Sequence, residues 1–360
     1  MLSRSENYGD GIWRNYLSLI QKCSEKYDAL MLSHSKEHTK LLSFDDHNFK
    51  KFRGEIYLEI VITSREFDDN MATAVRGAFG QMIDQLQDLN LTSLQYIIVP
   101  NDFGEELIEF QQRYQLREGY TNNEFGIAMG KVLSYFDDGQ YRNSIFLDHR
   151  VVLTLFEGDN LKQNAIHLIH HELCHVHDDY EKYRVFGEAD LEQVFFYTPD
   201  KVSQVTYAHA DLVWSEYIAT RLSSSSTPKD HDRYVDSLIS LIPKTKVDCE
   251  EAVLSYRTEG DISKLFGEIQ LSTSLLLKVV AYFIGYCHGS DIDPPDEMNN
   301  LVKQHPYLDG VWEKLSPLLH NLYESYGSWE SVEVFDDLAE IVLILWGNLG
   351  IYPENQNGVR

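Results

Sequence analysis

The chain has 360 residues with a hydrophobic content of 43% and an aromatic content of 12%, values typical of a folded globular protein that exclude a disordered or fibrous one. Its net charge of −26 at pH 7 disfavours binding to nucleic acid or anionic lipid, because both are themselves negatively charged. The cysteines at positions 23, 174, 249 and 287 form no CxxC pair and the N-terminus has no apolar stretch of signal-peptide length, so we expect a cytoplasmic protein.

The first 156 residues predict a mixed α/β region. A helix is expected at 11–33, and apolar residues at helical spacing predict two more at 71–89 and 103–115. Runs rich in β-branched and aromatic residues predict strands at 55–64, 94–100, 126–136 and 142–156. The segment "DDGQY" between the last two strands is a turn signal. We therefore expect a sheet of about four or five strands.

From residue 160 onward the pattern is almost entirely helical. Helices are expected at 161–179, 202–224, 230–243, 247–257, 261–287, 308–326 and 329–347. The segments "SSSSTPKD" and "DIDPPDE" are the clearest breaks, and the longest apolar run, 275–287, contains a lysine and is too short to span a bilayer. The predicted fold class is α+β, with an N-terminal α/β region at 1–156, a middle segment at 157–227 that contains two helices with the candidate site residues described below, and a C-terminal helical subdomain at 228–360.

Five histidines lie within the eleven residues 167–177, inside the predicted helix at 161–179. His171 and His175 are one turn apart on the side of this helix opposite its apolar stripe, so one cation can bridge their two imidazoles. Glu172 lies about 100° round the helix from His171, beside such a cation without binding it. This is the HExxH pattern, in which the glutamate takes a proton from water activated by the metal. The alternative is a solvated, histidine-rich helix that binds no metal.

A catalytic zinc needs a third protein ligand, and the best candidate is Glu216 in the predicted helix at 202–224. Its apolar neighbours indicate a buried helix, in which a carboxylate needs a partner that a cation can supply. The alternative is that Glu216 pairs with Arg221 or faces water. His171, His175 and Glu216 are therefore the expected ligands of one zinc ion per chain, although two histidines and a carboxylate also suit iron.

Residues 143–224 resemble a zincin metallopeptidase, nearest the gluzincins, and "HELCH" followed by "SEYIATRLSS" is also similar to the ImmA/IrrE group. The resemblance implies that His171, His175 and Glu216 bind zinc and that Glu172 is the general base. The interval between the two motifs is longer than in either group. Thr220 stands where thermolysin-like gluzincins place an aspartate that orients a ligand histidine, and Asp178 or Asp179 is an alternative for that role.

The resemblance also implies a group that polarises the scissile carbonyl and stabilises the oxyanion. His209, two turns before Glu216, is the first candidate, and Tyr217 and Tyr207 are weaker ones. The alternative is that His209 is a core or surface histidine. Among the remaining residues of the histidine-rich stretch, His167 is a weak candidate for a supporting role, His170 and His177 are expected to have none, and Cys174 is expected to be a buried filler.

In zincins an edge strand lies antiparallel to the substrate, and the resemblance places that strand at 143–155 and implies an extended peptide substrate. The sequence thus predicts a cytoplasmic zinc metallopeptidase, a hydrolase that acts on a peptide or protein. The alternative function is a catalytically silent metal-binding regulatory or interaction protein. The cleavage specificity, biological role and oligomeric state are open at this point.

Overall fold

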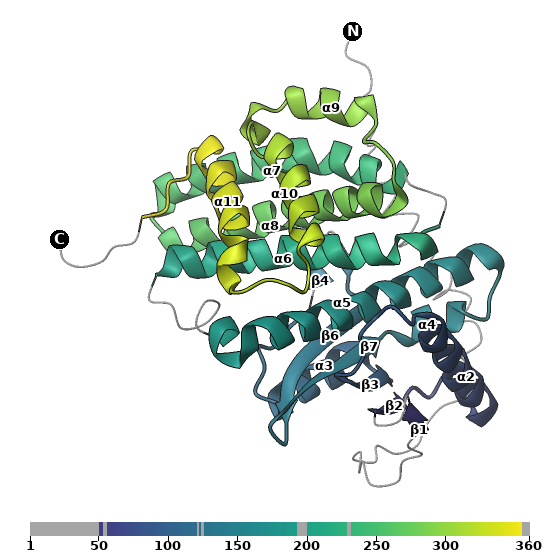
Figure 1. Ribbon diagram of the computed structural model, residues 1–360. Helices are drawn as coiled ribbons and strands as arrows, with labels where there is room; N and C mark the ends of the chain where they lie inside the picture. The colour runs from purple at the N-terminus through teal and green to yellow at the C-terminus, as the bar shows by residue number, and fades with distance from the viewer. Residues whose placement is uncertain are drawn as a thin grey trace. The chain divides into compact units, whose positions relative to one another are not determined.

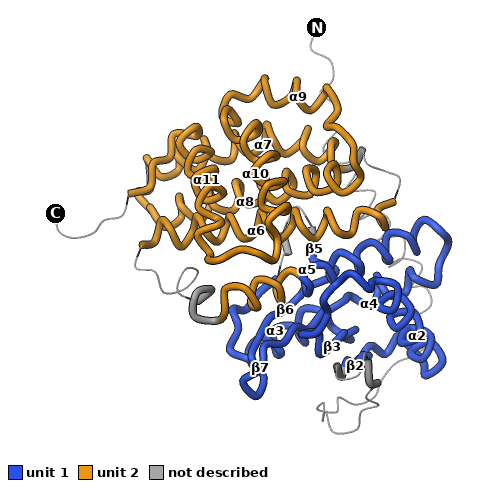
Figure 2. The backbone as a smooth tube through the Cα atoms, in the orientation of Figure 1, with its two compact units in different colours: residues 1–177 blue, residues 178–360 orange. Residues whose placement is uncertain are grey.

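A computed structural model describes residues 50–52, 56–120, 122–123, 126–192, 200–228 and 232–354 (Figure 1). The helix predicted at 11–33 lies outside these ranges. The chain divides into two compact units, residues 1–177 and 178–360, with the boundary inside helix α5 (Asp159–Glu192) (Figure 2). The sheet lies in the first unit and the second is helical, which confirms the α+β class at this coarse level. The finer division at 1–156, 157–227 and 228–360 stays a prediction.

The first unit is built around a mixed sheet with the strand order β1-β2-β3-β7-β6. Its strands are β1 (Lys50–Phe52), β2 (Ile56–Ile62), β3 (Leu94–Val99), β6 (Gly130–Asp137) and β7 (Gln140–Leu147). β2, β3 and β7 run parallel, whereas β1 and β6 are antiparallel to their neighbours. A separate two-stranded ladder joins β4 (Asn122–Asn123) to β5 (Gly126–Ile127). In the main sheet, β2 and β3 fall within segments predicted as strands, and β6 and β7 overlap the other two predicted segments.

The strand predicted at 142–156 is wrong beyond Leu147. Asp148 follows β7, and its side chain accepts a hydrogen bond of 2.9 Å from the backbone N–H of Arg150, which caps helix α4 (His149–Thr154). This cap outweighs the strand preference of the β-branched run behind it. Moreover, β7 lies between β3 and β6, so the predicted edge strand is an inner one and β6 is the edge.

Two helices of the first unit begin at an aspartate N-cap. Asp68 caps α2 (Asp69–Gln85) and Asp102 caps α3 (Phe103–Arg113) through their side-chain oxygens. The ring of Phe110 on α3 packs edge-on against Phe146 of β7, with centroids 5.3 Å apart. Residues 143–147 are all buried, which is the pattern of a strand covered on both faces.

The second unit contains α6 (Lys201–Ser223), α7 (Asp232–Glu259), α8 (Ile262–Ser290), α9 (Asp296–Lys303), α10 (Trp312–Glu324) and α11 (Asp336–Asn348), with short 3₁₀ turns η2 (Ser224–Ser226), η3 (Pro306–Leu308) and η4 (Val332–Phe335). The two helices predicted at 230–243 and 247–257 are a single helix, α7, with Pro243 inside it. Buried residues on both sides of Pro243 continue one apolar face, and their burial outweighs the backbone hydrogen bond that proline removes.

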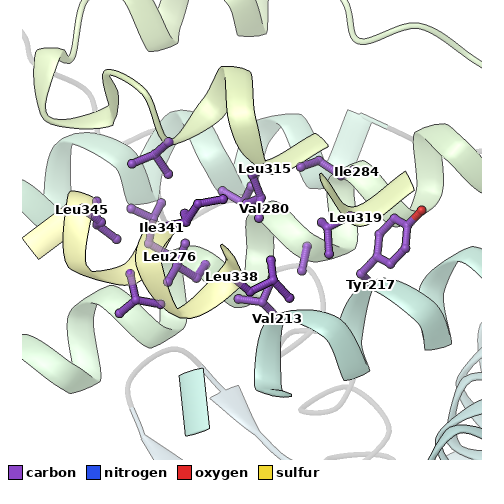
Figure 3. Packing of buried hydrophobic residues seen from close by; sticks show 14 of the residues in the cluster. Val213, Tyr217, Leu276, Val280, Ile284, Leu315, Leu319, Leu338, Ile341 and Leu345 are labelled. Carbon is purple, nitrogen blue, oxygen red and sulfur yellow. The ribbon is translucent and has the colours of Figure 1, made fainter. Parts of the chain in front are cut away.

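The core of this unit lies where α6, α8, α10 and α11 meet, as the labelled residues of Figure 3 show. α8 approaches α6 closely at Gly285, where an added Cβ would lie 2.6 Å from the carbonyl oxygen of Tyr217 and 3.1 Å from the Cβ of Thr220. Among the described residues, α8 is a helix long and apolar enough to cross a membrane by length and composition. It is nevertheless packed into this core, with its residues Leu276, Val280 and Ile284 buried, as a central helix of a folded unit also is.

Candidate metal centre

α5 carries the two histidines of the HExxH motif. Its residues Ile169, Leu173 and Val176 are buried with 0% exposure, which confirms the predicted apolar side, and His171 and His175 are half-buried. The helix continues past the predicted end at 179 up to Gly187, whose φ of 72° breaks it. The motif therefore lies in regular helix, several turns from either end.

The imidazoles of His171 and His175 converge. Their Nε2 atoms are 3.0 Å apart, and the ring centroids are 4.6 Å apart at an angle of 88°. Two nitrogens bound to one tetrahedral zinc at about 2.0–2.1 Å are separated by about 3.3 Å. The pair thus fits a zinc ion with a small adjustment of either ring. Without a cation the same distance suits a hydrogen bond between the rings, whose donor depends on the tautomers.

Glu216 lies on α6 with 6% exposure, among the buried side chains of Val213, Tyr217 and Ile218. His171 and His175 of the first unit and Glu216 of the second each offer one ligand atom to a group that could hold a metal ion. Two imidazole nitrogens and a carboxylate oxygen are the donors that catalytic zinc takes from proteins. The group predicted from the two motifs is therefore one that could hold a metal ion.

Lys278 is the partner of Glu216 that the sequence reasoning missed. Its Nζ lies 2.5 Å from Oε1 of Glu216. Burial alone would lower the pKa of Lys278, but the charges and hydrogen bonds of Glu216 and Tyr282 together outweigh burial and raise it. The predicted alternative partner, Arg221, instead donates to the hydroxyl of Tyr217 at 2.6 Å and lies over the ring of Tyr323. The signal that could have found Lys278 is its position as a charged residue in the longest apolar run of the sequence.

Glu172 lies against the edge strand of the sheet. A Cβ added to Gly130, the first residue of β6, would be 2.7 Å from Oε1 and 2.8 Å from Cδ of Glu172. Only the hydrogen of a glycine leaves room for the carboxylate at this place. The candidate general base is thus held next to the strand whose outer edge pairs with no other described strand.

His209, the predicted stabiliser of the oxyanion, lies in the helical core. It is 6% exposed, its Nδ1 is 2.8 Å from the carbonyl oxygen of Val205, and its ring packs edge-on against Trp346 with centroids 5.5 Å apart. Burial lowers the pKa of His209, partly offset by hydrogen bonds to the backbone at Val205 and Gln270. These surroundings favour the alternative of a core histidine, and its catalytic role stays a prediction.

The weaker candidates for that role have other partners. The hydroxyl of Tyr217 is 2.9 Å from Nδ1 of His288, and the hydroxyl of Tyr207 donates to Asp336. Among the candidates for a supporting carboxylate, Asp178 is fully buried, where it accepts hydrogen bonds from Trp214 and Tyr326 and pairs with Lys182. Thr220 has 1% exposure and its Cβ faces Gly285, so this position requires a small side chain for helix packing.

The other members of the histidine-rich stretch differ in their surroundings. His167 is buried with its ring 6.4 Å from that of His171, and His170 is buried so deeply that its pKa falls to about 4. Nδ1 of His177 accepts a hydrogen bond of 2.9 Å from the backbone N–H of Asn90 and so fastens α5 to the loop before β3. Cys174 has 0% exposure, as expected of a buried filler.

No protein-family model, curated protein or solved structure matches this chain significantly. The account of its function therefore depends on the residues and their geometry.

Proposed function

We propose that this chain is a zinc-dependent peptidase that uses His171, His175 and Glu216 as metal ligands and Glu172 as the general base. The observation that carries the proposal is the convergence of the two imidazoles, whose Nε2 atoms lie 3.0 Å apart, and Glu216 offers the carboxylate that could complete the ligand set. The HExxH spacing on a regular helix adds a carboxylate that a purely structural zinc site does not need.

In this account zinc, when bound, supplies Lewis acidity for the scissile carbonyl and lowers the pKa of water toward 7. Glu172 accepts a proton from the attacking water while the water oxygen forms a bond to the carbonyl carbon. The C–N bond then breaks, and Glu172 gives the same proton to the leaving amine. His171 and His175 hold the metal and take no part in the proton transfer.

The substrate class follows from the sheet. We assign the role of the substrate-binding edge to β6 in place of the segment 143–155, because β6 is the edge strand and begins at Gly130 beside Glu172. An extended peptide that adds to this edge makes backbone hydrogen bonds irrespective of its side chains. Its scissile bond would lie near the start of β6.

The test is hydrolysis of a peptide library by the zinc-loaded wild type and by Glu172→Gln, with exposed Glu157→Gln as the matched control. We expect the first variant to lose activity about a thousandfold while keeping its metal, and the control to match the wild type. Equal hydrolysis by all three proteins would refute the mechanism. Bound zinc with no hydrolysis of any peptide would leave the metal-binding regulatory protein as the better account.

A further inference from the structure

The charge of Glu216 is already neutralised by the protein itself. Its side chain is 8% exposed, and its Oε1 lies 2.5 Å from Nζ of Lys278, whose side chain is 32% exposed. A carboxylate this deeply buried is costly without a partner, and an ammonium at hydrogen-bond distance removes most of that cost. Lys278 therefore allows Glu216 to stay ionised inside the helical unit when no metal is bound.

Tyr282 lies one turn after Lys278 on α8 and belongs to the same group. Nζ of Lys278 is 5.5 Å from the centroid of the Tyr282 ring. Burial, followed by the negative charge of Glu216, raises the pKa of Tyr282, so its phenol keeps its proton. The pair is carried by α8, and the close approach at Gly285 fixes this helix against α6. The lysine is thus positioned by two packed helices and not by a flexible loop.

We propose that Lys278 is the resident cation of the metal site: it holds Glu216 in place before the metal arrives and then competes with the metal for it. This inference depends on the proposed function, because it assumes that Glu216 is a zinc ligand. A bound divalent ion and the ammonium group of Lys278 repel each other across a short distance in a site that is partly shielded from solvent. Lys278 is in these terms a positioning residue that stabilises the metal-free protein and weakens zinc binding.

The experiment compares Lys278→Met with the wild type, and uses Lys264→Met as the control, because Lys264 pairs with the exposed Glu259 near the start of the same helix. The melting temperature is measured in chelator and with zinc, and zinc affinity by competition with a chromophoric chelator. We expect Lys278→Met to melt roughly 3–6 °C lower in chelator. It should also bind zinc roughly tenfold more tightly and show a larger zinc-induced rise in melting temperature.

Two further variants keep the result interpretable. Lys278→Arg retains the charge and should restore the wild-type pattern, and this comparison holds even if Lys278→Met folds poorly. Adding Glu216→Gln to Lys278→Met should recover most of the stability lost in chelator, because no buried carboxylate is then left unpaired.

The outcomes separate this inference from the proposed function. If zinc binds the wild type but Lys278→Met neither melts lower in chelator nor binds zinc more tightly, the inference is wrong and the zinc site stands. If no variant binds zinc and Lys278→Met still melts lower in chelator, the pair is purely structural, and both the inference and the proposed function are overturned.

Discussion

Gly130 is the residue whose replacement reports most directly on the position of the general base. We expect Gly130→Ala to lower peptide hydrolysis by about tenfold to a hundredfold, because the new methyl group must displace the Glu172 carboxylate from its place beside β6. The protein should still fold and keep its zinc, since neither histidine is touched. The measurement is kcat and KM for a good peptide substrate together with the metal content.

A matched control is Gly77→Ala in α2, where no atom lies within 4 Å of the added Cβ. It should leave hydrolysis unchanged and stabilise the protein by about 0.5–1 kcal/mol, because alanine is the better helix former. Full activity in Gly130→Ala would show that Glu172 does not depend on this contact.

At the scale of elements, the packing of α8 on α6 positions Lys278 opposite Glu216, and Gly285 is one of the two glycines of α8, with Gly289, at which the helices approach most closely. Gly285→Ala should lower the free energy of unfolding by about 1–3 kcal/mol, because the methyl group would lie 2.6 Å from the backbone oxygen of Tyr217. Chemical denaturation of the metal-free protein measures this change.

Gly267→Ala, on the same helix with no atom within 4 Å of the added Cβ, should instead be neutral or stabilising by up to about 1 kcal/mol. If the two variants behaved alike, the helices could not be as close at Gly285 as described. The same contact explains why a small residue, Thr220, stands opposite Gly285, because a longer side chain at that position would separate α6 from α8.

Features within a single helix could be predicted from the sequence, whereas the contact between two helices could not. The apolar stripe of α5 and the spacing of His171 and His175 are local properties, and both were predictable from residues a few positions apart. The contact between Glu216 and Lys278 was not predictable, because these residues are 62 positions apart in sequence and meet only when two helices pack, and periodicity carries no information on such packing. The wrong prediction of a strand at 149–154 has another cause. The β-branched residues of this segment favour a strand, but the cap at Asp148 starts a helix there.

At the scale of the whole molecule, buried histidines make stability depend on pH. Burial, aided by the positive charges of Arg221 and His320, lowers the pKa of His288 to about 4, below its ordinary value of 6.5. In the unfolded chain the pKa of His288 returns to about 6.5, so between pH 6.5 and pH 4 the unfolded chain binds a proton more readily than the folded protein. The stability contributed by neutral His288 is therefore complete above pH 6.5 and is lost as the pH falls toward 4. At low pH this loss of stability opposes any gain in stability that comes from protonating the acidic surface residues.

His288→Gln should reduce the fall in melting temperature between pH 7.5 and pH 5, because glutamine does not titrate. Both proteins are compared in chelator, so that metal release at low pH does not contribute. His305→Gln is the comparison variant: burial, followed by the charge of Lys246, also lowers the pKa of His305, but this shift is smaller than that of His288, so the variant should reduce the fall less. An identical fall in His288→Gln and the wild type would contradict the assignment.

The decisive measurement for the three-ligand zinc site is the metal content per chain of protein purified without chelator and without an affinity tag. We expect about one zinc per chain in the wild type and a clear loss in Glu216→Ala. Glu250→Ala should retain the metal, because the side chain of Glu250 is 63% exposed on α7. Circular dichroism would establish that each variant is folded. Wild-type protein that contains no metal, even after incubation with zinc, would contradict the three-ligand site and with it the proposed peptidase.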